Sequence, residues 1–127
     1  MLIDIHTHIY TQRWLEILQE HSGIYHLKVR PDGQKEIFRG DTPVSIPQAG
    51  HFDYDIRIKV MDEAGIDISV VSLTAPSVYW GTEEVSCLAA QEANDSSAEA
   101  QANYPERIRW FTTLPWQYPD AAVAELE

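Results

Sequence analysis

The sequence predicts an α/β protein built from alternating strands and helices. Three runs rich in apolar and β-branched residues have the pattern of strands, at residues 2–5, 66–73 and 107–114. Segments with helical periodicity lie between and after these runs, and parallel neighbouring strands need crossovers of this kind. The order strand, insertion, helix, strand, helix, strand, helix therefore indicates consecutive βα units.

The first strand leads into the motif with the most functional information. Leu2–Ile5 is apolar except for Asp4, contains no glycine or proline, and continues directly into His6-Thr7-His8. Side chains two residues apart in a strand project to the same face, so both imidazoles can approach one cation. Imidazole is the commonest ligand for zinc and similar metals. The alternative is a chance pairing of one core histidine with one surface histidine.

Residues 10–50 have the pattern of an insertion after the first strand. A helix is expected at 11–20, where three large apolar residues recur at helical spacing. Two alternating runs, 24–29 and 35–39, flank a Pro-Asp-Gly turn and predict a hairpin. The prolines and glycines that follow predict a loop up to residue 50.

The regular part of the chain begins with a helix from residue 53 or 54 to Ala64, stopped by a glycine. Ile66–Leu73 follows as a nearly continuous β-branched strand, as expected for a sheet covered on both faces. After a loop at 74–81, Thr82 suits the N-cap of a long helix that ends before Pro105.

The sequence ends with a strand at Arg107–Leu114 and a helix at Ala121–Glu127, which Pro119 and Asp120 open. Three strands do not close a barrel, and a (β/α)₈ barrel needs about 250 residues. We therefore expect residues 1–127 to be the N-terminal portion of a single larger barrel domain, with residues 10–50 inserted in it. The open strand edge and the uncovered apolar faces favour this reading. The alternative is a compact α/β domain that dimerises.

Composition excludes several classes of partner. Twenty acidic and nine basic side chains give a net charge of −11, which repels nucleic acid phosphates and anionic lipid surfaces. The sequence has no apolar run of membrane-spanning length and no secretory leader, so we expect a cytoplasmic protein. The single cysteine, Cys87, cannot form an internal disulfide and is expected to be inert.

Several separated segments together resemble a known family. They are residues 3–8, 57–66, 94–99, 104–107, 113–115 and 119–127. In this order they are similar to the metal-dependent amidohydrolase superfamily, in the branch that contains aminocarboxymuconate semialdehyde decarboxylase and related aromatic-acid decarboxylases. The resemblance implies the first three βα units of a (β/α)₈ TIM barrel, with a small hairpin subdomain inserted after the first strand. It also implies a homodimer.

The resemblance assigns roles to four residues. His6 and His8 become two ligands of a zinc ion or another divalent metal, and the family's remaining ligands, a histidine and an aspartate from later strands, have no position in this chain. Arg39 matches the arginine that holds a substrate carboxylate, and Trp80 lies where it could wall the pocket. A solvated arginine and a packed tryptophan are the alternatives for these two residues.

The expected function is nonoxidative decarboxylation of a small unsaturated or aromatic carboxylic acid, with the 127-residue chain inactive alone. A divalent metal and Arg39 would make the pocket attractive to a carboxylate despite the net charge of −11. One alternative is a metal-dependent hydrolase of a lactone, ester or amide. Another is a non-catalytic association module that uses the open sheet edge.

Overall fold

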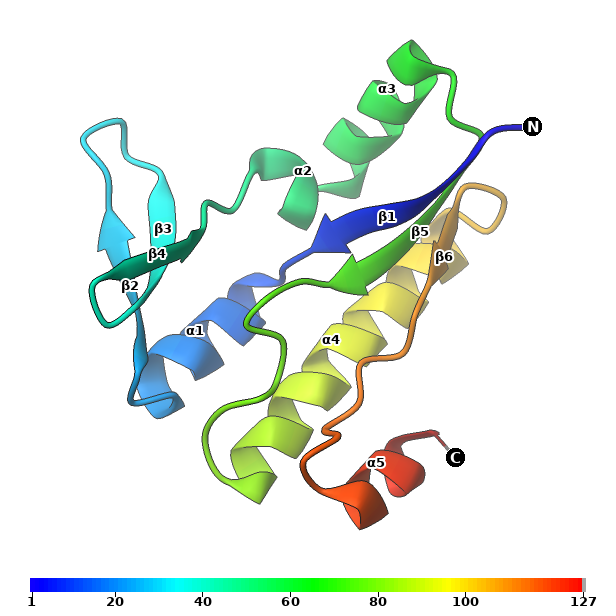
Figure 1. Cartoon of the computed structure of the whole chain (residues 1–127). Coiled ribbons are helices and arrows are strands. Elements are labelled where there is room, and N and C mark those ends of the chain that lie inside the picture. Colours follow the sequence, from blue (N-terminus) through cyan, green and yellow to red (C-terminus); the bar gives the residue numbers. More distant parts are fainter. Residues whose placement is uncertain (127) are drawn as a thin grey trace.

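The structure, a computed structural model that describes residues 1–126, contains two separate three-stranded sheets (Figure 1). Its elements, in chain order, are β1 (Ile3–Ile9), α1 (Gln12–His21), β2 (Tyr25–Val29), β3 (Lys35–Arg39), β4 (Thr42–Ser45), α2 (Ala49–Phe52), α3 (Tyr54–Ala64), β5 (Ile68–Leu73), α4 (Glu83–Asn103), β6 (Ile108–Trp110) and α5 (Pro119–Leu126). None of the helices within this described part combines the length and apolar character needed to cross a membrane.

The main sheet has the strand order β1-β5-β6, and both pairings are parallel. Helix α3 leads from β1 towards β5, and α4 connects β5 to β6, so the predicted βα order is confirmed. The helix starts follow local chemistry. Asp53 caps α3 by accepting hydrogen bonds from two backbone amides, and Thr82 caps α4 by accepting one from Val85.

One face of the main sheet is packed and the other is open. Ile9, Val71 and Ile108 pack with Met61 of α3 and Ala100 of α4 in one hydrophobic cluster. Figure 1 shows α4 behind the sheet, with β5 and β6 crossing in front of it. Because side chains alternate along a strand, the neighbours of these buried residues project to the opposite face, away from the helices.

The small antiparallel sheet, in the order β2-β3-β4, lies beyond the carboxyl end of β1 (Figure 1). Its central Ile37 is fully buried in a second cluster with Tyr10, Trp14 and Leu18. The predicted hairpin is therefore present, and it packs on α1 through this cluster.

Strand β4 corrects the loop that was predicted up to residue 50. Pro43 looked like a breaker, but β4 is an edge strand, where a missing amide hydrogen costs no ladder bond. The same segment also contains the start of the short helix α2.

The last elements differ from expectation in length. Strand β6 covers only Ile108–Trp110, because Thr113 bonds through its backbone to the side chain of Asn94 and leaves the ladder. Helix α5 includes both residues expected to open it and begins at Pro119, a residue type that suits the first turn. Its predicted last residue, Glu127, lies outside the described residues.

Candidate metal centre

A β-bulge places the histidine pair on β1. Asp4 pairs with Ser69 and Thr7 pairs with Val71, so β1 contains one more residue than β5 between these two pairs. The Asp4 carboxylate accepts a hydrogen bond from the His6 amide at 3.0 Å, within this irregular stretch. Bulges change the direction of side chains and occur frequently beside active sites.

The two imidazoles lie close together. Their ring centroids are 5.0 Å apart and the ring planes are inclined by 79°. A zinc–nitrogen bond is about 2.0–2.1 Å long, so two rings at this separation can bind one ion between them. His6 is exposed and His8 is half-buried, which leaves the space between them open to solvent and to a ligand.

His8 is held by two neighbours that the sequence analysis did not identify. Its Nδ1 lies 3.1 Å from the Ser72 hydroxyl of β5. The Arg57 guanidinium of α3 donates to the Thr7 hydroxyl at 2.6 Å and also to the His8 carbonyl oxygen. Arg57 is only 8% exposed, and burial lowers the pKa of its guanidinium.

Signals for both neighbours exist in the sequence. Ser72 is a polar residue within a strand that the sequence predicts to be covered on both faces, and such a strand has few reasons to keep one. Arg57 lies four residues before the buried Met61 and therefore on the same helix face, where a charge is unusual.

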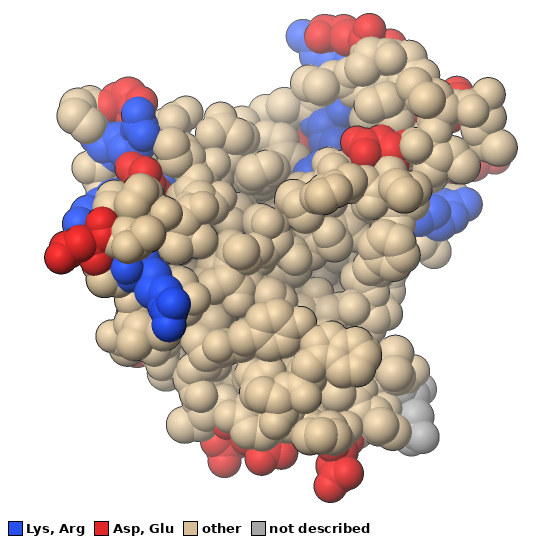
Figure 2. Space-filling view, in the orientation of Figure 1, with Lys and Arg blue, Asp and Glu red and all other residues tan. Residues whose placement is uncertain are grey.

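A cavity of about 320 Å³ lies behind β1, between it and α3. It is lined by Asp4, Thr7, Gln48, Gly50, His51, Ile56, Arg57, Val60, Met61, Ile66 and Ser69. Neither His6 nor His8 lines it, so the candidate site lies on the open face of the sheet and not in this cavity. Figure 2 shows that Lys, Arg, Asp and Glu side chains gather at the edges of the visible face and leave its centre uncharged.

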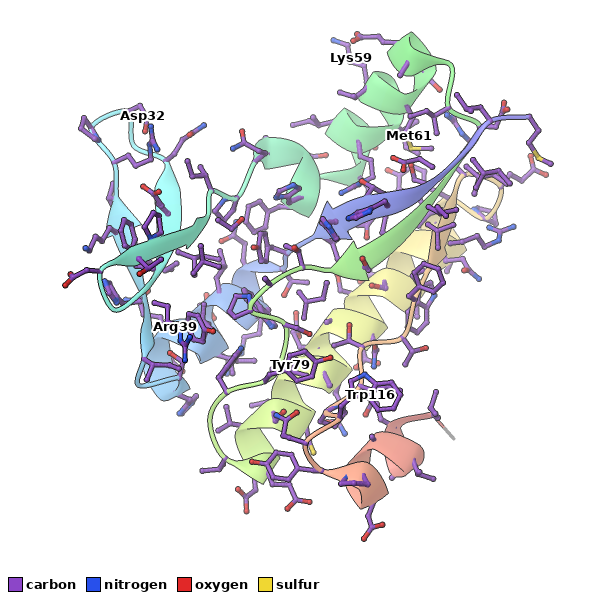
Figure 3. The ribbon with its side chains drawn as sticks, in the orientation of Figure 1. Asp32, Arg39, Lys59, Met61, Tyr79 and Trp116 are labelled. Atoms are coloured by element: carbon purple, nitrogen blue, oxygen red, sulfur yellow. The ribbon has the colours of Figure 1, made fainter. Side chains whose placement is uncertain are left out.

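The other sequence-predicted residues do not join the histidines in one cluster. Arg39 is exposed at the end of β3 on the small sheet (Figure 3). The Trp80 indole is 4% exposed, packs against Trp14 at a centroid distance of 6.0 Å, and donates to the Ser77 carbonyl. Its neighbour Tyr79 is 55% exposed. Within residues 1–126, no group of three or more His, Cys, Asp or Glu side chains could hold a metal.

Comparison with known proteins finds relatives that match part of the chain. No protein-family model matches the chain. Over 73 residues the chain is 45% identical to the gamma-resorcylate decarboxylase of Rhodococcus jostii (strain RHA1). The matched region is 57% of this chain and 22% of that relative.

Solved structures extend the likeness to nearly the whole chain. The structure of Metarhizium anisopliae IDCase in apo form has a TM-score of 0.84 at 23% identity, and covers 99% of this chain and 38% of that one. This likeness concerns the fold alone. The dihydroxybenzoic acid decarboxylase of Polaromonas sp. JS666, solved with bound manganese and the inhibitor 2-nitroresorcinol, has a TM-score of 0.67 at 28% identity. The matched region covers 100% of this chain and 34% of the Polaromonas chain.

The chain is thus homologous to gamma-resorcylate decarboxylases and shares its fold with amidohydrolase-type decarboxylases. This confirms the resemblance predicted from the separated sequence segments. The chain spans between about a fifth and two fifths of the length of these relatives, 22% of the first and 38% of the second.

Proposed function

We propose that this chain contributes the first part of the metal centre of a decarboxylase that acts on an aromatic carboxylic acid. The observation that supports this most directly is the His6–His8 pair, with ring centroids 5.0 Å apart, in a chain that is 45% identical over 73 residues to a decarboxylase. In the same proposal, β1, β5 and β6 are the first three strands of a TIM barrel, with residues 10–50 inserted after β1.

The ion in this proposal is a divalent metal. Two imidazoles suit zinc, and the related Polaromonas structure contains manganese, so either metal fits what is known. When bound, such an ion supplies positive charge that stabilises the negative charge left on the substrate as carbon dioxide departs. The task of His6 and His8 is to hold the ion at the open face of the sheet.

The proposed substrates are hydroxylated benzoates. This class is supported by a related 2,6-dihydroxybenzoate decarboxylase, whose structure contains 2,6-dihydroxybenzoate. The two proteins are 41% identical over a region that covers 60% of this chain. Arg39, exposed on the small sheet, is the proposed partner of the substrate carboxylate, because a guanidinium can donate two parallel hydrogen bonds to it. The indole of Trp80 acts through packing instead, since it is buried.

Two ligands alone form an incomplete catalytic site, which normally has three protein ligands and one open position. We therefore expect the 127-residue chain to bind a divalent metal weakly and to release no carbon dioxide from 2,6-dihydroxybenzoate. Turnover is expected only when the same residues form part of a complete barrel.

Metal binding is tested by equilibrium dialysis of the chain against Mn²⁺ and Zn²⁺. We expect His6→Ala and His8→Ala to abolish binding without loss of helical circular dichroism. His21→Ala removes an exposed histidine at the end of α1 and serves as the control, with binding expected to be unchanged. Equal binding by the chain and by His6→Ala would remove His6 from the site.

A further inference from the structure

We infer that Ser72 is a positioning residue for the candidate metal ligand His8, because it selects the tautomer that leaves Nε2 free for the ion. The inference rests on the proposed metal centre, but its geometric basis is independent of the metal. Ser72 lies directly opposite His8 in the register of β1 and β5, so both side chains leave the sheet on the same face. Its hydroxyl oxygen is 3.1 Å from His8 Nδ1.

A second acceptor beside the hydroxyl offers its proton a direction away from His8. Ser72 Oγ donates to the Thr7 carbonyl oxygen at 3.5 Å, a long contact. A carbonyl oxygen can only accept, whereas a hydroxyl has one proton and two lone pairs. With its proton directed at Thr7, the Ser72 oxygen offers a lone pair to His8, and this requires a proton on Nδ1.

A proton on Nδ1 leaves the lone pair on Nε2 of the neutral ring. Throughout residues 1–126, no hydrogen bond involves this Nε2. The lone pair is thus available to an ion, and the His6 ring lies on the same face of the sheet, with 5.0 Å between the two ring centroids. Histidine ligands of metals usually donate their second N–H to a neighbouring group that fixes ring orientation.

The backbone of His8 is fixed as well as its ring. Arg57 donates to the His8 carbonyl oxygen and, at 2.6 Å, to the Thr7 hydroxyl from the packed side of the sheet. By contrast, the ring of His6 has no hydrogen-bond partner in the described part of the chain. The two imidazoles therefore differ: His8 is already oriented before an ion arrives, and His6 is free to adjust.

The tautomer can be measured without any metal. We expect the ¹⁵N shifts of the ¹⁵N-labelled chain, at a pH about two units above the ordinary imidazole value of ~6.5, to give the Nδ1–H form for His8. Ser72→Ala should shift His8 towards the Nε2–H form that dominates in free imidazole side chains. Ser72→Thr, which keeps the hydroxyl, should restore the Nδ1–H form.

Ser69→Ala provides the matched control. Ser69 lies on the same strand, faces the packed side, and its buried hydroxyl has no hydrogen-bond partner in the structure. This variant should leave the His8 tautomer unchanged. An Nε2–H form of His8 in the unaltered chain, or a tautomer that Ser72→Ala does not change, would overturn the inference.

Metal affinity gives the second measurement. Second contacts of this kind typically contribute about 10–100-fold to metal affinity, so Ser72→Ala should weaken Mn²⁺ binding by that factor and Ser72→Thr should restore it. A chain that binds no Mn²⁺ but shows the Ser72-dependent tautomer contradicts the proposed function and supports the positioning role. A chain that binds Mn²⁺ with equal affinity before and after Ser72→Ala contradicts the positioning role alone.

Discussion

At the scale of single residues, the surroundings of His51 favour its neutral form. This residue lines the cavity between β1 and α3. His51 of α2 packs edge-on against Tyr10, with 5.5 Å between ring centroids, and its Nδ1 accepts a hydrogen bond from the Gln48 amide at 3.2 Å. Burial lowers the pKa of His51, and the nearby positive charge of Arg57 lowers it further. A protonated Nδ1 could no longer accept from Gln48, so this bond also requires the neutral ring.

The depressed pKa of His51 predicts a loss of stability in mild acid. In the unfolded chain the His51 ring takes up a proton near the ordinary imidazole pKa of about 6.5. In the folded chain it takes up the proton only at lower pH. The contribution of His51 is therefore fully present above the ordinary value and is lost as the pH falls through the lowered one. Urea denaturation of the metal-free chain across this range should show the decline.

His51→Gln should flatten this pH dependence, since glutamine does not titrate. His21→Gln, at an exposed position on α1, should leave it in place. A stability that is constant from neutral pH into mild acid in the unaltered chain would contradict the prediction.

At the scale of elements, one side chain decides where β6 ends and how α4 contacts the C-terminal segment. The Asn94 amide of α4 donates to the Thr113 carbonyl at 2.9 Å and accepts from the Thr113 amide at 2.7 Å. It also donates to the Glu125 carboxylate of α5 at 2.7 Å. Asn94 is 6% exposed, so water has little access to its side chain. The bonds to the Thr113 backbone and to the Glu125 carboxylate therefore take the place of bonds to water.

Asn94→Ala is expected to destabilise the chain by about 2–3 kcal/mol, because two backbone groups of Thr113 lose their partner. The measurement is the free energy of unfolding from chemical denaturation. Asn103→Ala, at an exposed position near the end of the same helix, is the control and should cost less than about 1 kcal/mol. Equal costs for the two variants would show that the Asn94 bonds contribute little.

Elements with regular patterns and clear caps were predictable, and elements set by tertiary contacts were not. Helix α3 has its capping Asp53 directly before its first residue and Gly65 directly after its last residue, so its bounds could be predicted almost to the residue. Strand β6 was predicted too long because its end depends on Asn94, far away in the chain. Strand β4 was missed because Pro43 is acceptable only at a sheet edge.

The candidate site was predictable in the same partial way. The histidine pair follows from spacing along one strand, whereas the contribution of Ser72 depends on the register between two strands. Arg57 holds Thr7 across 50 positions in the sequence, a contact that no local pattern contains.

At the scale of the whole molecule, the sheet face opposite the helices lacks a cover. Ile5 is 68% exposed, Phe111 57% and Trp116 65%, while charged side chains lie at the periphery of the visible face (Figures 2 and 3). Large apolar side chains left in water favour association, and β6 also has an unpaired edge within the described sheet. The homodimer and the cytoplasmic location implied by the sequence stay predictions.

We expect the chain to self-associate with increasing concentration in sedimentation velocity measurements. Trp116→Lys should weaken this association, because it places a charge among the exposed apolar residues. Val29→Lys alters a side chain that is 71% exposed on the small sheet, and it should have no effect. A compact monomer at all concentrations would contradict this expectation.

The extra residue in β1 has a consequence for protein engineering. Asp4 and Thr7, three positions apart, both line the cavity behind the sheet, so the pleat changes phase between them. Strict alternation after Asp4 would have placed the Thr7 side chain on the open face of the sheet, and His6 and His8 on the packed face. A design that transplants the imidazole pair together with the part of β1 that precedes it must therefore copy the surplus residue along with the three-residue motif.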